Sequence, residues 1–521
     1  MKNNQLLTLA LAASMLLSAS GCKKDEFLDV NQNPNNPTVV DVPVLLTGVI
    51  LTTGFANSND LGRVSSLLIQ HLAGTANQPA QYDIYNIRGS FDNQWNGELY
   101  GGALVNAKQL IDVATQKNSP AYSGIGKLML AYNFALTTDL YGDVPYSQAL
   151  QGLGNLSPRF DKQEDIYKGN SAKGIQSLFD LVKDGLADLD KVSALKPSGA
   201  DDPVYLGDLT KWKQMGNTLL LKLANTVSKK EPALAATIIN LAVTNGAITS
   251  NANDFQVPFG TATGNRSPLY QYNFDTRPDD QMLSQRLLDS MSVRNDPRLP
   301  LYFNQTQAKT ASVNTTATVN PTLGTYTGFQ NGAAQTIGSP ARIPVASNTA
   351  LTNRSRYNVY IRGTRGEAPV RLLTNFQRLF ILAESAVSLP GFVLPTGQTA
   401  QSLYTAAIRA SMTKAGVADA DVTTYLAANP RVGVLSTNPV LASNQILTQK
   451  WIAWVGNGCE AYNDYRRTGF PRLAVALNAA GDDITSIPKR IPYPNSEINS
   501  NTNAEGLDKG IRTSVPVWWA Q

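Results

Sequence analysis

The side chains that most often perform catalysis or bind metal ions are scarce in this chain of 521 residues. It contains one histidine, His71, and two cysteines, Cys22 and Cys459. A structural zinc site takes Cys and His ligands at short spacings, and no such spacing occurs here, nor does a phosphate-binding P-loop. We therefore expect no cofactor and no metal site, with His71 on a helix face or in the core and Cys459 as a small buried residue.

Two nearby carboxylates are the remaining catalytic possibility, because glycoside cleavage uses a pair of Asp or Glu side chains. Asp139 and Asp143 stand close together in the stretch TDLYGDVPY. Nothing in their spacing favours catalysis, and Asp143, which precedes Val-Pro, more simply caps a turn after a helix. A glycan-cleaving enzyme that uses paired carboxylates stays open as an alternative.

Cys22 stands at the end of an apolar N-terminal run, where it could carry a lipid. The run from Leu6 to Leu17 spans twelve residues, whereas a membrane-spanning helix needs about 20. A basic start, a short apolar stretch and the small residues ASG are typical of a secretory signal. The stretch LSASGC resembles a bacterial lipoprotein signal, so we predict a signal peptide over 1–21 and lipid attachment at Cys22. The alternative is an ordinary signal peptide followed by a chance cysteine.

Aromatic rings mixed with amides and arginine are residue types that suit sugars, because rings stack on the C–H faces of a sugar while polar groups bond its hydroxyls. One irregular segment, residues 82–96, combines these types. Its candidate ligand-binding residues are Tyr82, Tyr85, Arg88, Trp95 and Asn96. The alternative for Trp95 is that it begins the next helix and packs in the core. Weaker candidates in a later loop-rich region are Tyr357, Tyr360 and Arg362.

The composition of the chain argues against a nucleic-acid partner. Hydrophobic residues make up 42% of the chain and support a large core, whereas charged residues reach only 16%, below the roughly 25% of average proteins. The net charge is +5, and no block of Lys or Arg occurs. A nucleic-acid-binding protein would carry a basic patch or stripe, so we expect no nucleic-acid partner.

Helices must position the candidate residues. Apolar residues recur at helical spacing from Val44 to about Leu301, with Gly or Pro between the segments. Helical spacing returns in 376–389, 400–415, 422–427 and 445–455. Between these parts, residues 297–366 contain seven Lys or Arg and no Asp or Glu, and they indicate long loops with a few short strands. The predicted fold is mainly α: helical-repeat (tetratricopeptide-like) helix pairs with an inserted loop-rich subdomain.

The expected organisation follows from these segments. A signal peptide covers 1–21, a lipidated N-terminus and tether cover 22–43, and a single body covers 44–521, including the loop-rich excursion at 297–366. A helical-repeat scaffold without a small ligand is an alternative that this organisation leaves open.

Several motifs resemble those of the SusD/RagB family of outer-membrane nutrient-binding lipoproteins, in the same order along the chain. The stretch ALTTDLYGDVPYSQAL, residues 135–150, is similar to a helix-end motif of that family. Further similar motifs lie at 95–106, 378–386, 403–412, 449–453, 460–469 and 490–499. The resemblance spans nearly the whole chain and is best to the SusD-like, starch-binding-associated branch.

The resemblance implies repeated helix pairs with a looped subdomain, no catalysis, and a ligand site formed partly by an N-terminal loop. It also implies a partner, because family members cover a SusC-like TonB-dependent transporter and help to deliver glycans or peptides to it. Lys24, Asp25 and Glu26 resemble the export signal that sends such lipoproteins to the cell surface. The alternative for these three residues is a plain charged spacer.

Charged residues within the matching motifs are expected to hold the fold rather than a ligand. Arg presents a planar fork that suits carboxylates. We expect ion-pair and hydrogen-bond nodes at Asp464 with Arg466 and Arg467, and similarly at Arg490 and Glu497.

The expected function is that of a lipid-anchored, surface-exposed protein of the outer membrane. It binds an oligosaccharide and delivers it to the transporter without catalysis. A peptide or another polymer as the ligand is the alternative within the same role.

Overall fold

The computed structural model of the protein describes residues 40–278, 280–305, 326–333, 354–504 and 511–521. The predicted signal peptide and nearly all of the tether lie outside the described residues, as do two stretches of the loop-rich excursion. The same holds for Cys22, Lys24, Asp25 and Glu26. Among the helices that the structure describes, none is long and apolar enough to cross a membrane.

Helices account for most of the described chain, which confirms the predicted mainly α class. Those of the first half are α3 (Val42–Ser58), α4 (Asp60–Leu68), α5 (Asn77–Asp83), the π-helical η2 (Gln94–Leu104), α6 (Val105–Gln116), α7 (Pro120–Tyr141), α8 (Gln163–Lys168), α9 (Leu178–Asp188), α10 (Leu209–Val227) and α11 (Pro232–Thr244). Those of the second half are α12 (Pro268–Tyr270), the π-helical η6 (Gln271–Asp275), α13 (Gln285–Ser292), α14 (Leu299–Tyr302), α15 (Val359–Arg362), α16 (Asn375–Ser388), α17 (Ala400–Ala415), α18 (Asp419–Ala428), α19 (Pro430–Gly433), α20 (Pro439–Ala453), α21 (Gly458–Thr468) and α22 (Asn495–Ser500).

Local sequence sets the ends of several helices. The side chains of Asp208 and Thr374 accept hydrogen bonds from backbone N–H groups in the first turns of α10 and α16, which satisfies donors that a helix leaves free at its start. At the other end, Gly416 and Gly469 take φ angles of 102° and 78°. This left-handed conformation favours glycine, and it closes α17 and α21.

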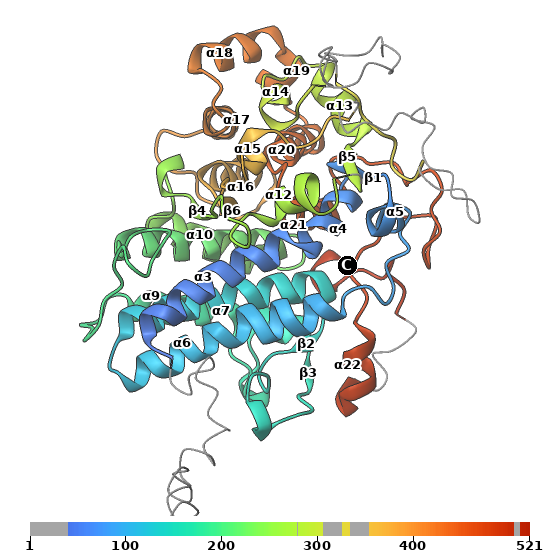
Figure 1. The fold of residues 1–521 in the computed structure, drawn as a ribbon. Coiled ribbons are helices and arrows are strands. Elements are labelled where there is room, and N and C mark those ends of the chain that lie inside the picture. The colour runs from blue at the N-terminus through green and yellow to red at the C-terminus, as the bar shows by residue number, and fades with distance from the viewer. Residues whose placement is uncertain (1–39, 279, 306–325, 334–353, 505–510) are drawn as a thin grey trace, which may run out of the picture.

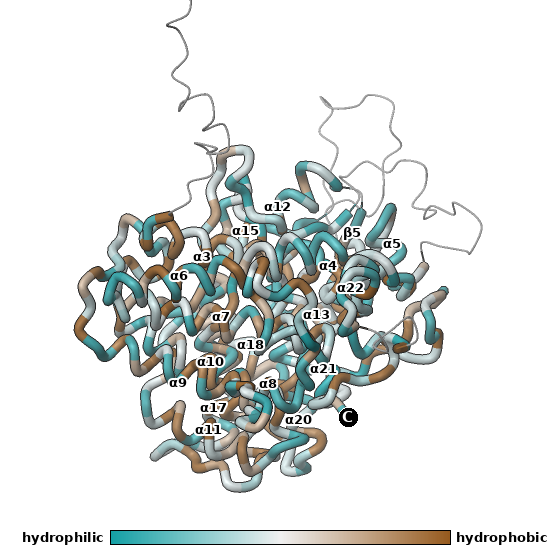
Figure 2. Tube along the Cα trace, turned by 90° about the horizontal axis from the view of Figure 1, so that it is seen from below, coloured by the Kyte–Doolittle hydropathy of each residue, from teal (hydrophilic) through white to brown (hydrophobic). Residues whose placement is uncertain are grey.

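The helices pack in pairs, as the repeat pattern predicts. α6 packs on α7, α7 on α9, α10 on α11, and α16 on both α17 and α20. Figure 1 shows α3, α6, α7, α9 and α10 stacked in one part of the molecule, with α16, α17 and α20 beyond them. α7 is the central helix: every residue from Ala121 to Tyr141 except Lys127 is buried. Figure 2 shows the contrast in hydropathy between such inner helices and the hydrophilic α5.

Short antiparallel strand pairs join distant parts of the chain. β1 (Leu72–Gly74) pairs with β5 (Gln281–Leu283), β2 (Val144–Pro145) with β3 (Phe160–Asp161), and β4 (Phe255–Val257) with β6 (Val370–Leu373). Leu72 faces Leu283 in the first pair and Val257 faces Val370 in the last. The β1–β5 pair therefore fixes the N-terminal helices to the segment that carries α12 and η6.

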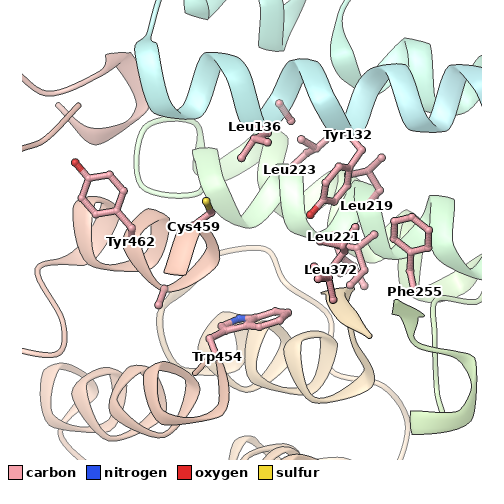
Figure 3. Close-up of a cluster of buried hydrophobic side chains, with 14 of the residues drawn as sticks. Tyr132, Leu136, Leu219, Leu221, Leu223, Phe255, Leu372, Trp454, Cys459 and Tyr462 are labelled. Carbon is pink, nitrogen blue, oxygen red and sulfur yellow. The ribbon is translucent and has the colours of Figure 1, made fainter. Parts of the chain in front are cut away.

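Part of the hydrophobic core lies where α7, α10 and α21 meet the β4–β6 pair (Figure 3). Tyr132 of α7 meets Phe255 of β4 edge to face, with ring centroids 6.1 Å apart. Leu221, Leu372 and Trp454 are buried in the same cluster. Complete burial of one such side chain contributes about 1.5–3 kcal/mol, so a core of this size stabilises the body strongly.

The lone histidine and Cys459 are both buried, as expected. His71 is 0% exposed, its Nε2 lies 2.8 Å from the Trp451 carbonyl oxygen, and burial lowers its pKa to about 3. Cys459 Sγ lies 3.6 Å from Ser65 Oγ, and burial raises the pKa of the thiol to about 11. The helical spacing at His71 was misleading, because α4 ends at Leu68 and the chain continues into β1.

A buried ionic cluster links α16, α20 and α21. Arg467 donates to both carboxylate oxygens of Glu384, at 2.6 and 2.9 Å, and to Asp464 at 3.0 Å. Lys450 also donates to Asp464, at 3.0 Å. The expected node at Asp464 and Arg467 is therefore confirmed, whereas Arg466 instead donates to the backbone oxygen of Asp139, at 2.5 Å.

Candidate functional site

Three of the five predicted ligand residues lie in the core. Tyr82, Tyr85 and Trp95 are 0%, 3% and 2% exposed. Trp95 Nε1 donates to Glu497 Oε2 at 3.2 Å, and its ring meets Tyr141 edge to face at 4.9 Å. Core packing, the alternative expected for Trp95, is what the structure has, and a ring without exposed surface offers no face to a sugar.

The two buried tyrosines also have internal partners. The ring of Tyr82 stacks on Phe91 with centroids 5.5 Å apart. The hydroxyl of Tyr85 accepts a hydrogen bond from the backbone N–H of Ala476 at 2.8 Å. Both rings therefore join the N-terminal segment to its surroundings.

Arg88 and Asn96 are the exposed members of the predicted set. Arg88 pairs with Asp482 at 2.8 Å, and Asn96 Nδ2 donates to Ser496 Oγ at 2.8 Å. Both side chains therefore contact segments near the C-terminus. The five predicted ligand residues do not form one common surface. Their role in ligand binding stays a prediction, now confined to these two accessible side chains.

The weaker candidates divide in the same way. Tyr357 is 1% exposed and packs on Phe303, with centroids 5.5 Å apart. Tyr360 stacks on Tyr302 at 5.3 Å. Arg362 alone reaches a partly exposed group of rings.

That group, the aromatic–arginine cluster, gathers rings from α12 and η6 with guanidinium groups from three other parts of the chain. Its members are Tyr270, Tyr272, Phe274, Arg63, Arg266, Arg356 and Arg362. The three rings are partly exposed. They are the aromatic side chains that sequence reasoning passed over; the available signal was the alternation of rings and amides in YQYNF.

Helical geometry brings two of the rings together. Tyr270 and Phe274 stand four residues apart and so share a helix face. Their rings stack at 5.6 Å with planes 22° apart. Gln271 Nε2 donates to the backbone oxygen of Arg266 at 2.7 Å, and Asn273 Nδ2 donates to that of Leu269 at 2.8 Å. These bonds fix the short helix that carries the ring pair.

Guanidinium groups surround the ring pair. The centres of Arg356 and Arg362 lie 4.2 and 4.0 Å from the Phe274 centroid, and Arg266 lies 5.5 Å from that of Tyr270. Gly366 permits this approach, since its φ is 105° and a Cβ there would meet the Arg266 side chain at 2.7 Å. Cation–π contacts of this kind hold arginines flat on rings, so the surface combines apolar faces with N–H donors.

The third ring connects the cluster to the N-terminal helices. Arg63 of α4 lies 4.3 Å from the Tyr272 centroid and 3.5 Å from Asp60 Oδ1. Burial, followed by the charge of Asp60, raises the pKa of Tyr272. Tyr82 belongs to the same neighbourhood, because the Asp60 charge also raises its pKa after burial. Tyr82, which belongs to the segment predicted to bind the ligand, therefore lies next to the cluster.

Hydrogen-bond acceptors lie beside Tyr272. Gln94 Nε2 lies 3.2 Å from Asp60 Oδ2 and 3.3 Å from Glu98 Oε1, and Asn59 Nδ2 donates to that Glu98 oxygen at 2.5 Å. Within the described part of the chain, one further oxygen of each of these four side chains has no hydrogen-bond partner. Burial raises the pKa of Asp60 and that of Glu98, the latter to about 7. Glu98 can therefore donate or accept a hydrogen bond near neutral pH.

Partly exposed rings and guanidinium donors together suit a neutral, hydroxyl-rich ligand. Binding sites for small molecules generally combine aromatic lining with a few placed polar groups. Among the described residues, no group of His, Cys, Asp and Glu is arranged to hold a metal ion.

Comparison with known proteins gives the family. The sequence matches the SusD-like family, described as starch-binding and associating with the outer membrane, over residues 34–494. The chain belongs to this family. Its members are non-catalytic binding proteins associated with the outer membrane, so the chain is a binding protein rather than an enzyme. No curated protein matches the sequence significantly.

Solved structures show the same SusD-like fold. A chitin-binding protein is 24% identical, with a TM-score of 0.73 over 92% of this chain and 100% of the other. A SusD homologue from Bacteroides uniformis is 23% identical, with a TM-score of 0.71 over 92% and 99%. A chitin-binding SusD homologue from Flavobacterium johnsoniae is 21% identical, with a TM-score of 0.70 over 91% and 98%.

The carboxylate pair considered for glycoside cleavage is arranged for structure. Asp139 is 0% exposed, and its Oδ1 accepts hydrogen bonds from the Tyr167 hydroxyl at 2.6 Å and from Trp519 Nε1 at 2.9 Å. Asp143 pairs with Lys162 at 2.8 Å. A glycosidic bond cannot reach the buried Asp139, so Asp139 and Asp143 cannot act as a catalytic pair in this SusD-like chain.

Proposed function

We propose that this SusD-like protein binds an oligosaccharide at the aromatic–arginine cluster and delivers it to a SusC-like TonB-dependent transporter. The observation that carries the proposal is the partly exposed, stacked pair Tyr270 and Phe274, with arginines around it. The family description as starch-binding and the chitin-binding relatives support a glycan as the ligand.

The proposal includes the cell-surface location. The signal peptide over 1–21 would be removed, Cys22 would carry the lipid, and Lys24, Asp25 and Glu26 would direct the protein outward. Residues 22–43 would act as the tether, and the body over 44–521 would then cover the transporter. The family's association with the outer membrane supports this arrangement.

Isothermal calorimetry with malto- and chito-oligosaccharides tests the site. Truncation of an aromatic anchor in a binding site costs about 2 kcal/mol or more, so Phe274→Ala should weaken binding roughly thirtyfold. Phe392→Ala is the matched control, because this partly buried ring lies in the α16–α17 loop. Equal affinities for the parent and Phe274→Ala would place the ligand elsewhere. Binding of peptides instead of either glycan would favour the alternative ligand.

A further inference from the structure

A groove outside the aromatic–arginine cluster runs along α13 and α20. Three adjoining hollows form it, with volumes of about 520, 480 and 300 Å³. The first and second share Arg294, Asn444 and Thr448 in their linings, and the second and third share Arg286 and Asp289. The three hollows therefore adjoin one another and are treated together as the α13–α20 groove, and no residue of the cluster lines them.

Arginines dominate the charge of this groove. Arg286, Arg431 and Arg472 are exposed along it, and none of the three has an ion-pair partner among the described residues. Arg294 uses its guanidinium on Ser290, whose backbone oxygen lies 2.5 Å from Nη1. Asp289 is the one carboxylate among the described residues of the lining, and it accepts a hydrogen bond from Gln285 Nε2 at 2.7 Å.

This arrangement attracts anions. A cleft lined by charges of one sign concentrates its field and gathers ligands of the opposite sign. The planar fork of arginine also matches the oxygens of a carboxylate or sulfate in a bidentate manner. Arg286 lies in α13, Arg294 follows the end of that helix, and Arg431 and Arg472 come from other parts of the chain, so the positive charges are distributed along the groove, which suits a chain rather than a single ion.

The groove also offers neutral hydrogen-bonding groups at fixed positions. Gln445 Nε2 donates to the Arg431 carbonyl oxygen at 2.7 Å, and Gln445 Oε1 accepts from the backbone N–H of Ser436 at 2.8 Å. Asn444 Oδ1 lies 3.5 Å from Thr448 Oγ1, while its amide nitrogen donates to no described residue. Amide and hydroxyl groups between arginines suit a ligand that alternates hydroxyls with acidic groups.

We propose that the α13–α20 groove is a second saccharide site, specific for acidic oligosaccharides that carry carboxylate or sulfate groups. This inference deepens the proposed function and rests on it. The cluster would hold neutral sugar rings through stacking, whereas the groove would hold acidic sugars through arginines. A flat acidic protein surface is the rival occupant, but it fits a hollowed surface less well.

The test uses the full chain and oligosaccharides of equal length. Oligogalacturonate supplies carboxylates, a sulfated oligosaccharide supplies sulfates, and a malto-oligosaccharide is the neutral probe. Calorimetry at low and high salt should show acidic ligands binding with an affinity that falls as salt rises, because salt screens exposed charges. The double variant Arg286→Gln/Arg472→Gln should weaken acidic-ligand binding at least tenfold, or about 1.4 kcal/mol, and leave the neutral ligand unaffected.

Arg512→Gln is the matched control, since it removes an exposed arginine that does not line the groove. All the substituted side chains are exposed, so the variants should melt like the parent. If the protein binds neutral but not acidic ligands, the groove is not a saccharide site, while the proposed site at the cluster is unaffected. Failure of all the glycans would reject the proposed function itself. If the double variant still binds acidic ligands like the parent, the groove is not the acidic-saccharide site. The same conclusion follows if the double variant loses only its association with the transporter.

Discussion

Substitution of Trp95 distinguishes most clearly between a role in stability and a role in ligand binding. Its ring is 2% exposed and contacts Tyr100, Tyr141 and Tyr493, with centroids 4.8, 4.9 and 6.2 Å away. Truncation of a buried Trp to Ala costs about 3–5 kcal/mol. Loss of the hydrogen bond to Glu497 adds about 1 kcal/mol, so Trp95→Ala should lower the free energy of unfolding by about 4–6 kcal/mol.

Guanidinium unfolding followed by circular dichroism measures this loss, and calorimetry on the folded variant measures ligand affinity. Asn96→Ala is a close control, because Asn96 is the next residue, is exposed, and donates only to Ser496. Surface changes of that kind usually shift stability by about 0.5 kcal/mol or less. We expect Trp95→Ala to unfold early and bind normally while folded. A Trp95→Ala protein that unfolds like the parent but loses affinity would show instead that Trp95 contacts the ligand.

Three further predictions concern charge and export. Burial raises the pKa of Glu98 from 4.5 to about 7, so protonated Glu98 favours the folded state. The contribution of Glu98 to the free energy of unfolding, up to about 3 kcal/mol, is present below pH 4.5 and is lost as the pH rises through 7. Glu98→Gln should abolish this pH dependence of unfolding, and an unchanged profile would contradict the assignment. Cys22→Ala should yield a protein without fatty-acid label that leaves the membrane, whereas retained label would exclude Cys22 as the attachment site. Replacement of Lys24, Asp25 and Glu26 by Ala should keep the lipid and protect the protein from external protease on intact cells; equal digestion would leave these residues as a plain spacer.

The sequence predicted the architecture well because helical periodicity is a local signal. α7 and α10 follow directly from apolar spacing, and the family motifs fix their order. Boundaries were less accurate: α20 begins at Pro439 rather than near residue 445. Asn438 caps that helix with its side chain, a signal that lies outside the apolar pattern.

The candidate site was harder to predict, because exposure depends on contacts between distant residues. Tyr85 and Trp95 stand in a segment rich in polar residues, yet their partners Ala476 and Glu497 lie about 400 residues away. Conversely, Phe274 looks like a core residue in sequence but remains partly exposed beside arginines. Composition identifies the residue types of a sugar site, whereas the three-dimensional packing decides which rings reach the surface.

A crystal structure of the protein with a saturating malto- or chito-oligosaccharide would show whether the aromatic–arginine cluster holds the sugar. We expect a sugar ring stacked over the Tyr270 and Phe274 pair, with its hydroxyls bonded to the arginines of the cluster. A sugar bound at the Arg88 and Asn96 surface, with the Tyr270 and Phe274 rings uncovered, would contradict it.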